Sequence, residues 1–397
     1  MGNMNVYEVT KQIEDEMIAF AQEVVRTRSL TCKEQNVVKL IEDRMRKLGY
    51  DRVEEDDMGN VMGVIGTGEP YVLFDGHMDT VDVVDGSEWK YGPYSGEIVD
   101  GLLYGRGSSD MKSGLVASIY GAYVAKEAGL IPKDRSVWVS ASLMEEDFDG
   151  EALRYVLESR KLRPEYVVVC EPTTDLRIGV GHRGRSLIEV NVEGVGCHGS
   201  SPHKGKNPIY VLSQVIDRVK KLNEDFYRMP GEHPSVACTK IYCLTASENA
   251  VPQTATVVLD RRTALGDTEE SVSAEMDKLI AGLDGASWRF RDFKGTSWKG
   301  MDFVYHNFMK AWELPPTHPL IQKTAALVRD VCKKEPELFR FQDNTNATSS
   351  AGTFDIPSVI ICPGNLETAH ARDEYCPVKD IVEACQIYAY LCSEEKP

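Results

Sequence analysis

The sequence predicts an α/β protein in which helices flank a mixed β-sheet, with a smaller α+β domain inserted into the chain. Helical and strand patterns alternate over residues 1–178 and again over 313–397, and such alternation is typical of a parallel or mixed sheet covered by helices. Between these regions the order strand-helix-strand-strand-helix-strand is that of a ferredoxin-like module. At 397 residues the chain exceeds one ordinary hydrophobic core, which favours two domains. We therefore expect a discontinuous first domain over 1–178 and 313–397 and an inserted domain over 179–312.

The first domain opens with two amphipathic helices, because apolar residues recur at helical spacing over 7–26 and 34–48. Short apolar runs then predict strands, and the turn Met58-Gly59-Asn60 separates the first two of them. These strands cover residues 52–55, 61–65, 72–74, 136–144 and 166–170. Further helices are expected at 111–129, where Ala, Ser and Gly allow close packing, and at 151–161.

The pattern of the sequence changes near Gly179, where the inserted domain begins. Alternation of polar and apolar residues predicts half-exposed strands, and helical periodicity predicts two helices among them. In chain order these elements are a strand at 186–193, a helix at 207–223, strands at 235–244 and 255–261, a helix at 268–283 and a strand at 288–292. The α/β pattern then resumes with a helix at 318–334, a strand at 358–362 and a helix at 379–392.

The composition argues against several classes of protein. The 62 acidic residues outnumber the 45 basic ones and give a net charge of −17, which disfavours nucleic acid and anionic membranes as partners. No apolar run is long enough to span a membrane, and the acidic N-terminus lacks the pattern of a signal peptide. The ten cysteines lack metal-binding spacing, so we interpret them as reduced structural thiols, with Cys170 beside Glu171 as an alternative ligand. We therefore expect a cytoplasmic protein.

Carboxylates and histidines follow four of the predicted strands. In chain order they are His77 with Asp79, Glu145 with Glu146, Glu171, and His370. Asp110 ends a Gly-rich turn just before a helix. Ligands of open α/β sheets gather beyond the carboxyl ends of the strands, and these residue types hold the ions of hydrolytic metal centres.

Taken singly, these residues have ordinary explanations. His77 could lie in a polar loop, Asp110 could cap a helix, and Glu145 with Glu146 could form a solvated acidic turn. The turn before Asp110 lacks the pattern of a nucleotide-binding loop. Their joint occurrence at strand ends favours a metal centre.

Together the motifs resemble those of the dinuclear-zinc amidohydrolases and peptidases, a family that includes acetylornithine deacetylase, succinyl-diaminopimelate desuccinylase, aminoacylase and glutamate carboxypeptidase. The resemblance covers nearly the whole chain. Its motifs are Gly76-His77-Met78-Asp79-Thr80-Val81, Gly105-Arg106-Gly107-Ser108-Ser109-Asp110-Met111-Lys112, Glu145-Glu146-Asp147, Glu171-Pro172-Thr173 and Ala369-His370. Within the family, the chain looks most similar to the hydrolases linked to selenium metabolism. The resemblance implies a zinc-exopeptidase-like catalytic domain with an inserted lid or dimerisation domain.

The resemblance also implies a role for each residue. Two Zn²⁺ per subunit are expected, with Co²⁺ or Mn²⁺ as alternatives. The metal ligands would be His77 and Glu171 for one ion, Glu146 and His370 for the other, and Asp110 for both. Asp79 would orient His77, Glu145 would be the general base, and the peptide bond Asp110–Met111 would be cis.

Further matches lie in the expected inserted domain, in Gly196-Cys197-His198-Gly199-Ser200-Ser201-Pro202, in Asn249 and in Asp260-Arg261-Arg262. The resemblance implies that His198 reaches the site of a partner subunit and steadies the oxyanion, within a homodimer formed through this domain. It also implies that Asn249 and Arg262 contact the substrate. The alternatives are an ordinary loop histidine for His198 and a surface salt bridge for Arg262.

One segment departs from the family. Where many relatives have Gly-Thr-Asp, this chain reads Gly352-Thr353-Phe354. We expect Phe354 to make the pocket wall more apolar, and Gly352 and Thr353 to contact the substrate carboxylate through backbone N–H groups.

We therefore expect a metal-dependent hydrolase that cleaves the amide bond of an N-acyl amino acid or a related small substrate. Glu145 would take a proton from a metal-bridging water and return it to the leaving amine. A dipeptidase or carboxypeptidase with the same machinery, acting on a short peptide, is the main alternative, because loop shape selects the leaving group. A metal-binding protein with a retired site is a remote alternative, against which the intact Glu145 and Asp79 argue.

Overall fold

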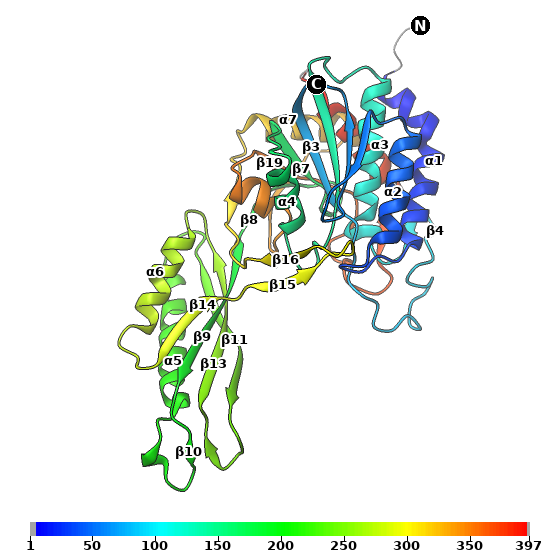
Figure 1. The fold of residues 1–397 in the computed structure, drawn as a ribbon. Helices are drawn as coiled ribbons and strands as arrows, with labels where there is room; N and C mark the ends of the chain where they lie inside the picture. The colour runs from blue at the N-terminus through cyan, green and yellow to red at the C-terminus, as the bar shows by residue number, and fades with distance from the viewer. Residues whose placement is uncertain (1–4, 395–397) are drawn as a thin grey trace. The chain divides into compact units, whose positions relative to one another are not determined.

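The computed structural model describes residues 5–394, and the chain forms two compact units (Figure 1). The first comprises Met1–His182, Gly295–Phe303 and Glu313–Pro397, and the second comprises Arg183–Lys294 and Val304–Trp312. The second unit therefore differs from the expected 179–312 at its edges. Residues 179–182 belong to a strand of the first unit's sheet, and Trp298 Nε1, in 295–303, donates to the Gly59 carbonyl at 3.3 Å. No helix in the described range is both long and apolar enough to cross a bilayer.

A mixed sheet, nine-stranded over the described residues, forms the centre of the first unit. Its order is β1-β2-β6-β3-β7-β19-β8-β17, with β18 beside β8. The inner strands β6 (Arg135–Ser142), β3 (Glu69–His77), β7 (Tyr166–Val169) and β19 (Ser358–Ile360) run parallel to one another. The outer strands are β1 (Arg52–Glu55), β2 (Val61–Ile65), β8 (Ile178–His182), β17 (Trp312–Glu313) and β18 (Leu338–Phe341). The predicted mixed sheet is confirmed, and the inner strands end at one edge.

Helices flank this sheet, as predicted. They are α1 (Val6–Arg26), α2 (Gln35–Lys47), α3 (Ser113–Glu127), α4 (Glu151–Ser159), α7 (Pro319–Cys332) and α8 (Val378–Leu391). Helix α3 is buried on nearly all sides, because it contacts β3 and β6 as well as α1 and α8. Its glycines permit this packing: a Cβ at Gly114 would lie 2.1 Å from Cys362 Sγ, and one at Gly121 would lie 2.8 Å from Tyr388 Cβ.

A small three-stranded sheet joins segments that are far apart in the chain. Its strands are β4 (Glu97–Val99), β5 (Leu102–Tyr104) and β20 (Tyr375–Pro377), in the order β20-β5-β4. Tyr375 pairs with Tyr104 in an antiparallel register, so the loop after β5 starts beside the segment that precedes β20. These strands were not predicted, because three residues are too few to show alternation in the sequence.

The second unit is built on a four-stranded antiparallel sheet in the order β11-β13-β9-β14. Its elements are, in chain order, β9 (Gly184–Glu193), α5 (Pro208–Phe226), β11 (Ser235–Leu244), β13 (Thr254–Thr263), α6 (Glu269–Ile280) and β14 (Ala286–Phe290). This is the predicted ferredoxin-like order. Alternate residues of β9, among them Ile188 and Val190, face both helices in one apolar core.

Strand β11 forms one edge of this sheet. Most of its residues are exposed, including Cys238, Ile241 and Cys243. Beyond it, the short strands β10 (Cys197–His198) and β12 (Ala250–Val251) pair with each other. A two-stranded pairing of β15 (Phe293–Thr296) with β16 (Asp302–Tyr305) was also not predicted from the sequence.

Candidate metal centre

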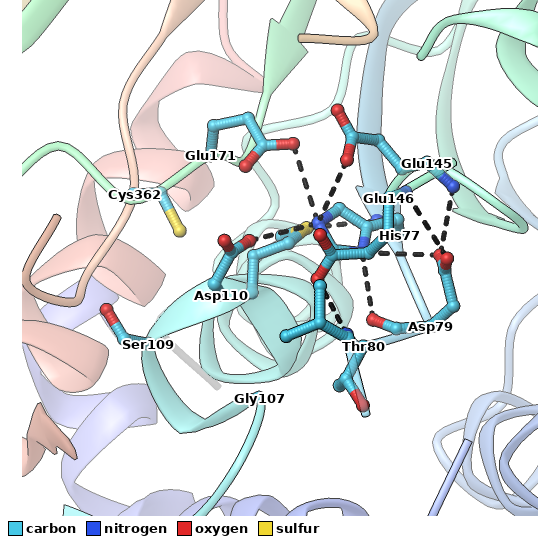
Figure 2. A network of polar contacts seen from close by, with 12 residues as sticks. His77, Asp79, Thr80, Gly107, Ser109, Asp110, Glu145, Glu146, Glu171 and Cys362 are labelled. Carbon is cyan, nitrogen blue, oxygen red and sulfur yellow. Dashed lines mark hydrogen bonds and ion pairs between the residues drawn. The ribbon is translucent and has the colours of Figure 1, made fainter. Parts of the chain in front are cut away.

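The predicted metal-site residues converge beyond the carboxyl ends of the inner strands. They are His77 at the end of β3, Glu145 and Glu146 after β6, Glu171 after β7, Asp110 in the loop between β5 and α3, and His370 in the loop after β19. Figure 2 shows Glu145, Glu146, Glu171 and Asp110 gathered around His77. The peptide bond Asp110–Met111 is cis, as the resemblance implies.

Asp110 lies between two groups of ligand atoms. On one side, His77 Nε2 is 3.1 Å from Asp110 Oδ1 and 3.6 Å from Glu171 Oε1. On the other, His370 Nε2 is 3.2 Å from Asp110 Oδ2 and 2.9 Å from Glu146 Oε2. Within each group the ligand atoms all lie within 4.8 Å of one another. The structure thus brings together the five candidate ligands in the two sets that the resemblance implies.

The electrostatics of this cluster favour bound cations. Burial raises the pKa of Glu171 well above its usual range, and burial with the charge of Glu171 does the same for Glu145. Burial also raises the pKa of Glu146 to about 7. Buried carboxylates this close repel one another unless positive charge compensates them. Oxygen and imidazole donors suit Zn²⁺, Co²⁺ or Mn²⁺, so the residues present fit a pair of divalent ions.

Asp79 is fully buried and holds both His77 and the loop after β6. His77 Nδ1 lies 3.0 Å from the carbonyl oxygen of Asp79 and 3.4 Å from its Oδ1, which directs Nε2 towards Asp110. The carboxylate oxygens of Asp79 also accept hydrogen bonds from the backbone N–H groups of Glu145 at 3.0 Å and Glu146 at 3.3 Å. One carboxylate therefore positions residues of both ligand groups.

The two residues before Glu145 are held in the same way. The N–H of Leu143 donates to Asn60 Oδ1 at 3.1 Å, and the N–H of Met144 donates to Glu34 Oε1 at 3.2 Å. Met144 has a φ of 55°, which is unfavourable for a residue other than glycine. Asn60 and Glu34 were not predicted as site residues, because each lies where turn or helix-cap chemistry already explains its residue type.

Gly352 and Thr353 lie at the end of the short π-helix Thr348–Thr353. The ring centroid of Phe354, the next residue, is 4.6 Å from the guanidinium carbon of Arg163. Arg163 precedes β7, whereas Glu171 follows it. Phe354 therefore contacts a residue at the amino end of that strand, not one at the end that carries the metal-site residues.

Asn346 lies just before this segment, contacts the inner strand β3, and is not among the predicted site residues. Its Nδ2 donates to Asp75 Oδ2 at 2.7 Å, and its Oδ1 accepts from the N–H of Gly150 at 2.8 Å. Asp75 belongs to β3, two residues before His77. A lone asparagine in a polar loop carries no signal of this contact in the sequence.

His198, Asn249 and Arg262 lie in the second unit. The exposed His198 belongs to β10, where its Nδ1 accepts from the N–H of Ser200 at 3.1 Å. Asn249 is brought beside this strand, because its carbonyl accepts from the N–H of Gly199 at 2.7 Å. Arg262, on β13, pairs with Asp260, its Nε lying 2.8 Å from Oδ1.

The sequence matches the family described as Peptidase family M20/M25/M40 over residues 73–394. It is 31% identical over 391 residues to the uncharacterized protein YgeY of Escherichia coli (strain K12), covering 97% of this chain and 96% of that protein. It is 28% identical to a succinyl-diaminopimelate desuccinylase of Phenylobacterium zucineum, covering 94% of this chain and 97% of that protein.

Solved structures share the fold along nearly the whole chain. The M20 family metallo-carboxypeptidase Sso-CP2 of Sulfolobus solfataricus superposes with a TM-score of 0.72 at 18% identity, covering 95% of this chain and 98% of that one. The YXEP protein of Bacillus subtilis, described as a dinuclear metal binding peptidase of the M20 family, gives 0.69 at 15% identity, with coverages of 96% and 98%. The chain belongs to peptidase family M20/M25/M40 and is a metallohydrolase acting on amide or peptide bonds.

Proposed function

We propose that this protein is a two-metal deacylase that hydrolyses the amide bond of an N-acyl amino acid or a related small substrate. The observation that carries the proposal is the position of Asp110 between two complete groups of ligand atoms. In the proposed assignment, the ligands are His77, Asp110 and Glu171 for one Zn²⁺ and Asp110, Glu146 and His370 for the other. When bound, the two ions polarise the substrate carbonyl and lower the pKa of the attacking water.

Glu145 is the proposed general base. Its Oε2 lies 3.9 Å from His77 Nε2, and it belongs to neither group of ligand atoms. Burial and the charge of Glu171 raise its pKa above that of an exposed glutamate, in the direction that suits a group that first accepts and then returns a proton. It takes the proton of the attacking water on a carboxylate oxygen and delivers that proton to the leaving nitrogen. Asp79 orients His77 throughout.

The second unit is proposed to supply substrate contacts. His198 would steady the oxyanion, and Asn249 would contact the substrate. Arg262 would release Asp260 and bind the carboxylate of the substrate instead. In the first unit, the backbone of Gly352 and Thr353 would contact the same carboxylate.

A homodimer through the second unit is part of the proposal, with His198 acting in the partner's site. Its support is an exposed set of large apolar side chains on β11 and α5. These are Ile241, Tyr242 and Leu244 on the strand and Ile209 and Tyr210 on the helix. Apolar surface of this kind on an edge strand and its neighbouring helix is typical of subunit contacts.

The deacylase is favoured over a dipeptidase or carboxypeptidase by the desuccinylase relative at 28% identity. The similar peptidase structures, at 20% identity or less, support the fold alone. A metal-binding protein that has lost its catalytic activity is disfavoured. Such a protein would have no need of a buried Glu145 beside both complete ligand groups.

Metal removal and restoration tests this proposal. The protein is stripped with a chelator and assayed on succinyl and acetyl amino acids and on dipeptides, with Zn²⁺, Co²⁺ or Mn²⁺ added back. We expect hydrolysis of an N-acyl amino acid to disappear on stripping and to return with two equivalents of metal. Activity that survives the chelator would contradict the two-metal mechanism, and restored activity on dipeptides alone would replace the deacylase with a dipeptidase.

A further inference from the structure

The loop that carries Asp110 is held by the carboxylate of Glu374, which is not among the candidate metal ligands. Glu374 Oε1 accepts hydrogen bonds from the N–H groups of Ser109 and Asp110, each at 2.9 Å. Its Oε2 accepts from the N–H of Gly107 at 3.0 Å and from Nη1 of Arg106 at 2.7 Å. The Glu374 side chain is 0% exposed. Four donors thus occupy the acceptor sites of one buried carboxylate.

The fold brings this carboxylate to the loop. Strand β20 pairs with β5 so that Glu374, just before β20, lies beside Gly105, just after β5; the N–H of Gly105 donates to the Glu374 carbonyl at 3.0 Å. The loop then turns at Gly107, where φ is 82° and a Cβ would lie 2.6 Å from Thr80 Cγ2. A glycine is therefore required there, and the turn directs successive N–H groups inward in the manner of an anion-binding nest.

Arg106 extends the contact to the second ligand group. While Nη1 pairs with Glu374, Nη2 donates to the backbone carbonyl of His370 at 3.2 Å. His370 itself has a φ of 61°, an unfavourable conformation for a residue other than glycine. Arg106 is only 4% exposed, and its guanidinium carbon lies 5.2 Å from the ring centroid of Trp89. The ion pair therefore contacts both the shared ligand Asp110 and the segment that presents His370.

We propose that Glu374, together with Arg106, is a positioning residue that presets Asp110 and His370 for the binding of both metal ions. This inference rests on the proposed function, because it takes Asp110 and His370 to be ligands. The physical reason is preorganisation: a ligand already fixed by bonds outside the metal shell loses less freedom when the ion binds. A purely structural ion pair would affect folding stability and leave the affinity for metal unchanged.

The test is a Zn²⁺ titration of metal-free protein in competition with a chromophoric chelator. In Glu374→Gln an amide NH₂ group replaces one carboxylate oxygen. That NH₂ group faces two of the four donors and cannot accept a hydrogen bond from either. We expect both stepwise association constants for Zn²⁺ to fall about 10-fold or more. The absorption spectrum of the Co²⁺-loaded variant is expected to change as well, because it reports the geometry of the ligands.

Glu151→Gln is the matched control. Glu151 is 4% exposed and pairs with Arg154 at 2.6 Å, and it contacts no candidate ligand. Its substitution is expected to lower the melting temperature and to leave both association constants for Zn²⁺ unchanged. Arg106→Gln completes a double-mutant cycle: if the two residues act as a unit, the double variant binds Zn²⁺ no more weakly than the weaker single variant.

The outcomes separate this inference from the proposed function. Wild-type protein that fails to bind two Zn²⁺ would overturn both. Wild-type protein that binds two ions, with Glu374→Gln binding them equally well, would overturn only the role of Glu374. An equal loss of affinity in Glu151→Gln would also overturn it, because the effect would then follow stability. If Glu374→Gln does not fold, Glu374→Asp and Arg106→Lys are titrated in its place, with the same expected direction.

Discussion

Glu145 and Glu146 are neighbours in the sequence, yet their surroundings separate them. Glu146 approaches His370 within 2.9 Å and belongs to a ligand group, whereas Glu145 stands 3.9 Å from His77 and belongs to none. Both have their N–H groups fixed by Asp79. The backbone is thus held while the side chains diverge, which lets adjacent acids take different roles.

Replacing Glu145 by Gln is expected to lower kcat by about 10²–10⁴-fold, since an amide cannot accept the proton of water. Metal content is expected to stay at the wild-type value, because the residue lies outside both ligand groups. Steady-state kinetics on metal-loaded protein and metal analysis check the two expectations. Asp147→Asn, in the same loop, serves as the control with near-normal kcat. A Glu145→Gln enzyme of normal kcat would remove this residue from the mechanism.

The sequence predicts those site residues whose chemical type and position beside an apolar run both point to metal binding. An acid or histidine within a few residues of the end of an apolar run, such as His77 or Glu171, is visible without coordinates. Glu34, Asn346 and Glu374 are not visible, because they act on segments distant in the chain. Their partners are mostly backbone N–H groups, which every sequence contains. Only the fold reveals which of these groups a given carboxylate meets.

Elements differ in how far the sequence determines them. The amphipathic helices α1 and α2 follow from periodicity, and β6 follows from its apolar run. The apolar run 72–74 marks only the middle of β3, which extends over Glu69–His77. Strands β5 and β20 have three residues each, and their pairing depends on contacts between distant segments. These short strands nevertheless align the Asp110 loop with Glu374, so the elements hardest to predict contribute directly to the candidate site.

Helix α8 carries a buried acid in its first turn, and this should make stability depend on pH. Burial and the nearby charge of Glu383 raise the pKa of Asp380 to about 6. Between pH 4 and 6 the folded protein then keeps a proton that the unfolded chain has lost. The free energy of unfolding therefore falls as pH rises through this range. Asp380→Asn is expected to raise it by about 1–2 kcal/mol above pH 6.

Denaturant unfolding of metal-free protein between pH 4 and 8 checks this expectation. The Asp380→Asn variant should show a flatter pH profile than the wild type, with the two proteins converging near pH 4. Glu127→Gln, which changes an exposed acid on α3, should reproduce the wild-type profile. Equal stabilities of Asp380→Asn and wild type at pH 7 would mean that the carboxyl group ionises without cost in the fold.

The molecule as a whole divides its chemistry between two units. The first contains all candidate metal ligands and Glu145, and the second contains His198, Asn249 and Arg262. The change in pattern near Gly179 and the return of α/β alternation near 315 predict this division. The exact edges do not follow from the sequence, because residues 295–303 join the first unit through contacts such as that of Trp298 with Gly59.

Mixing two inactive variants tests whether His198 works in a partner's site. Equal amounts of His198→Ala and His77→Ala, exchanged between dimers, are expected to regain up to about a quarter of wild-type activity, since half the dimers are mixed and each has one intact site. Each variant alone should remain inactive. Activity of the mixture is measured against the separate variants at the same total concentration. No recovery, with subunit exchange demonstrated, would mean that His198 acts in its own chain's site or has no catalytic role.

The distribution of thiols gives the protein a built-in chemical readout. Cys170, Cys362, Cys376, Cys385 and Cys392 are buried in the first unit, whereas Cys238 and Cys243 are exposed on the edge strand β11. An alkylating reagent applied to the native protein should therefore mark β11 before it reaches the interior thiols. Peptide mass spectrometry can then follow two events in one sample: loss of labelling on β11 reports that this edge has been covered, and labelling of the interior thiols reports that the core has opened.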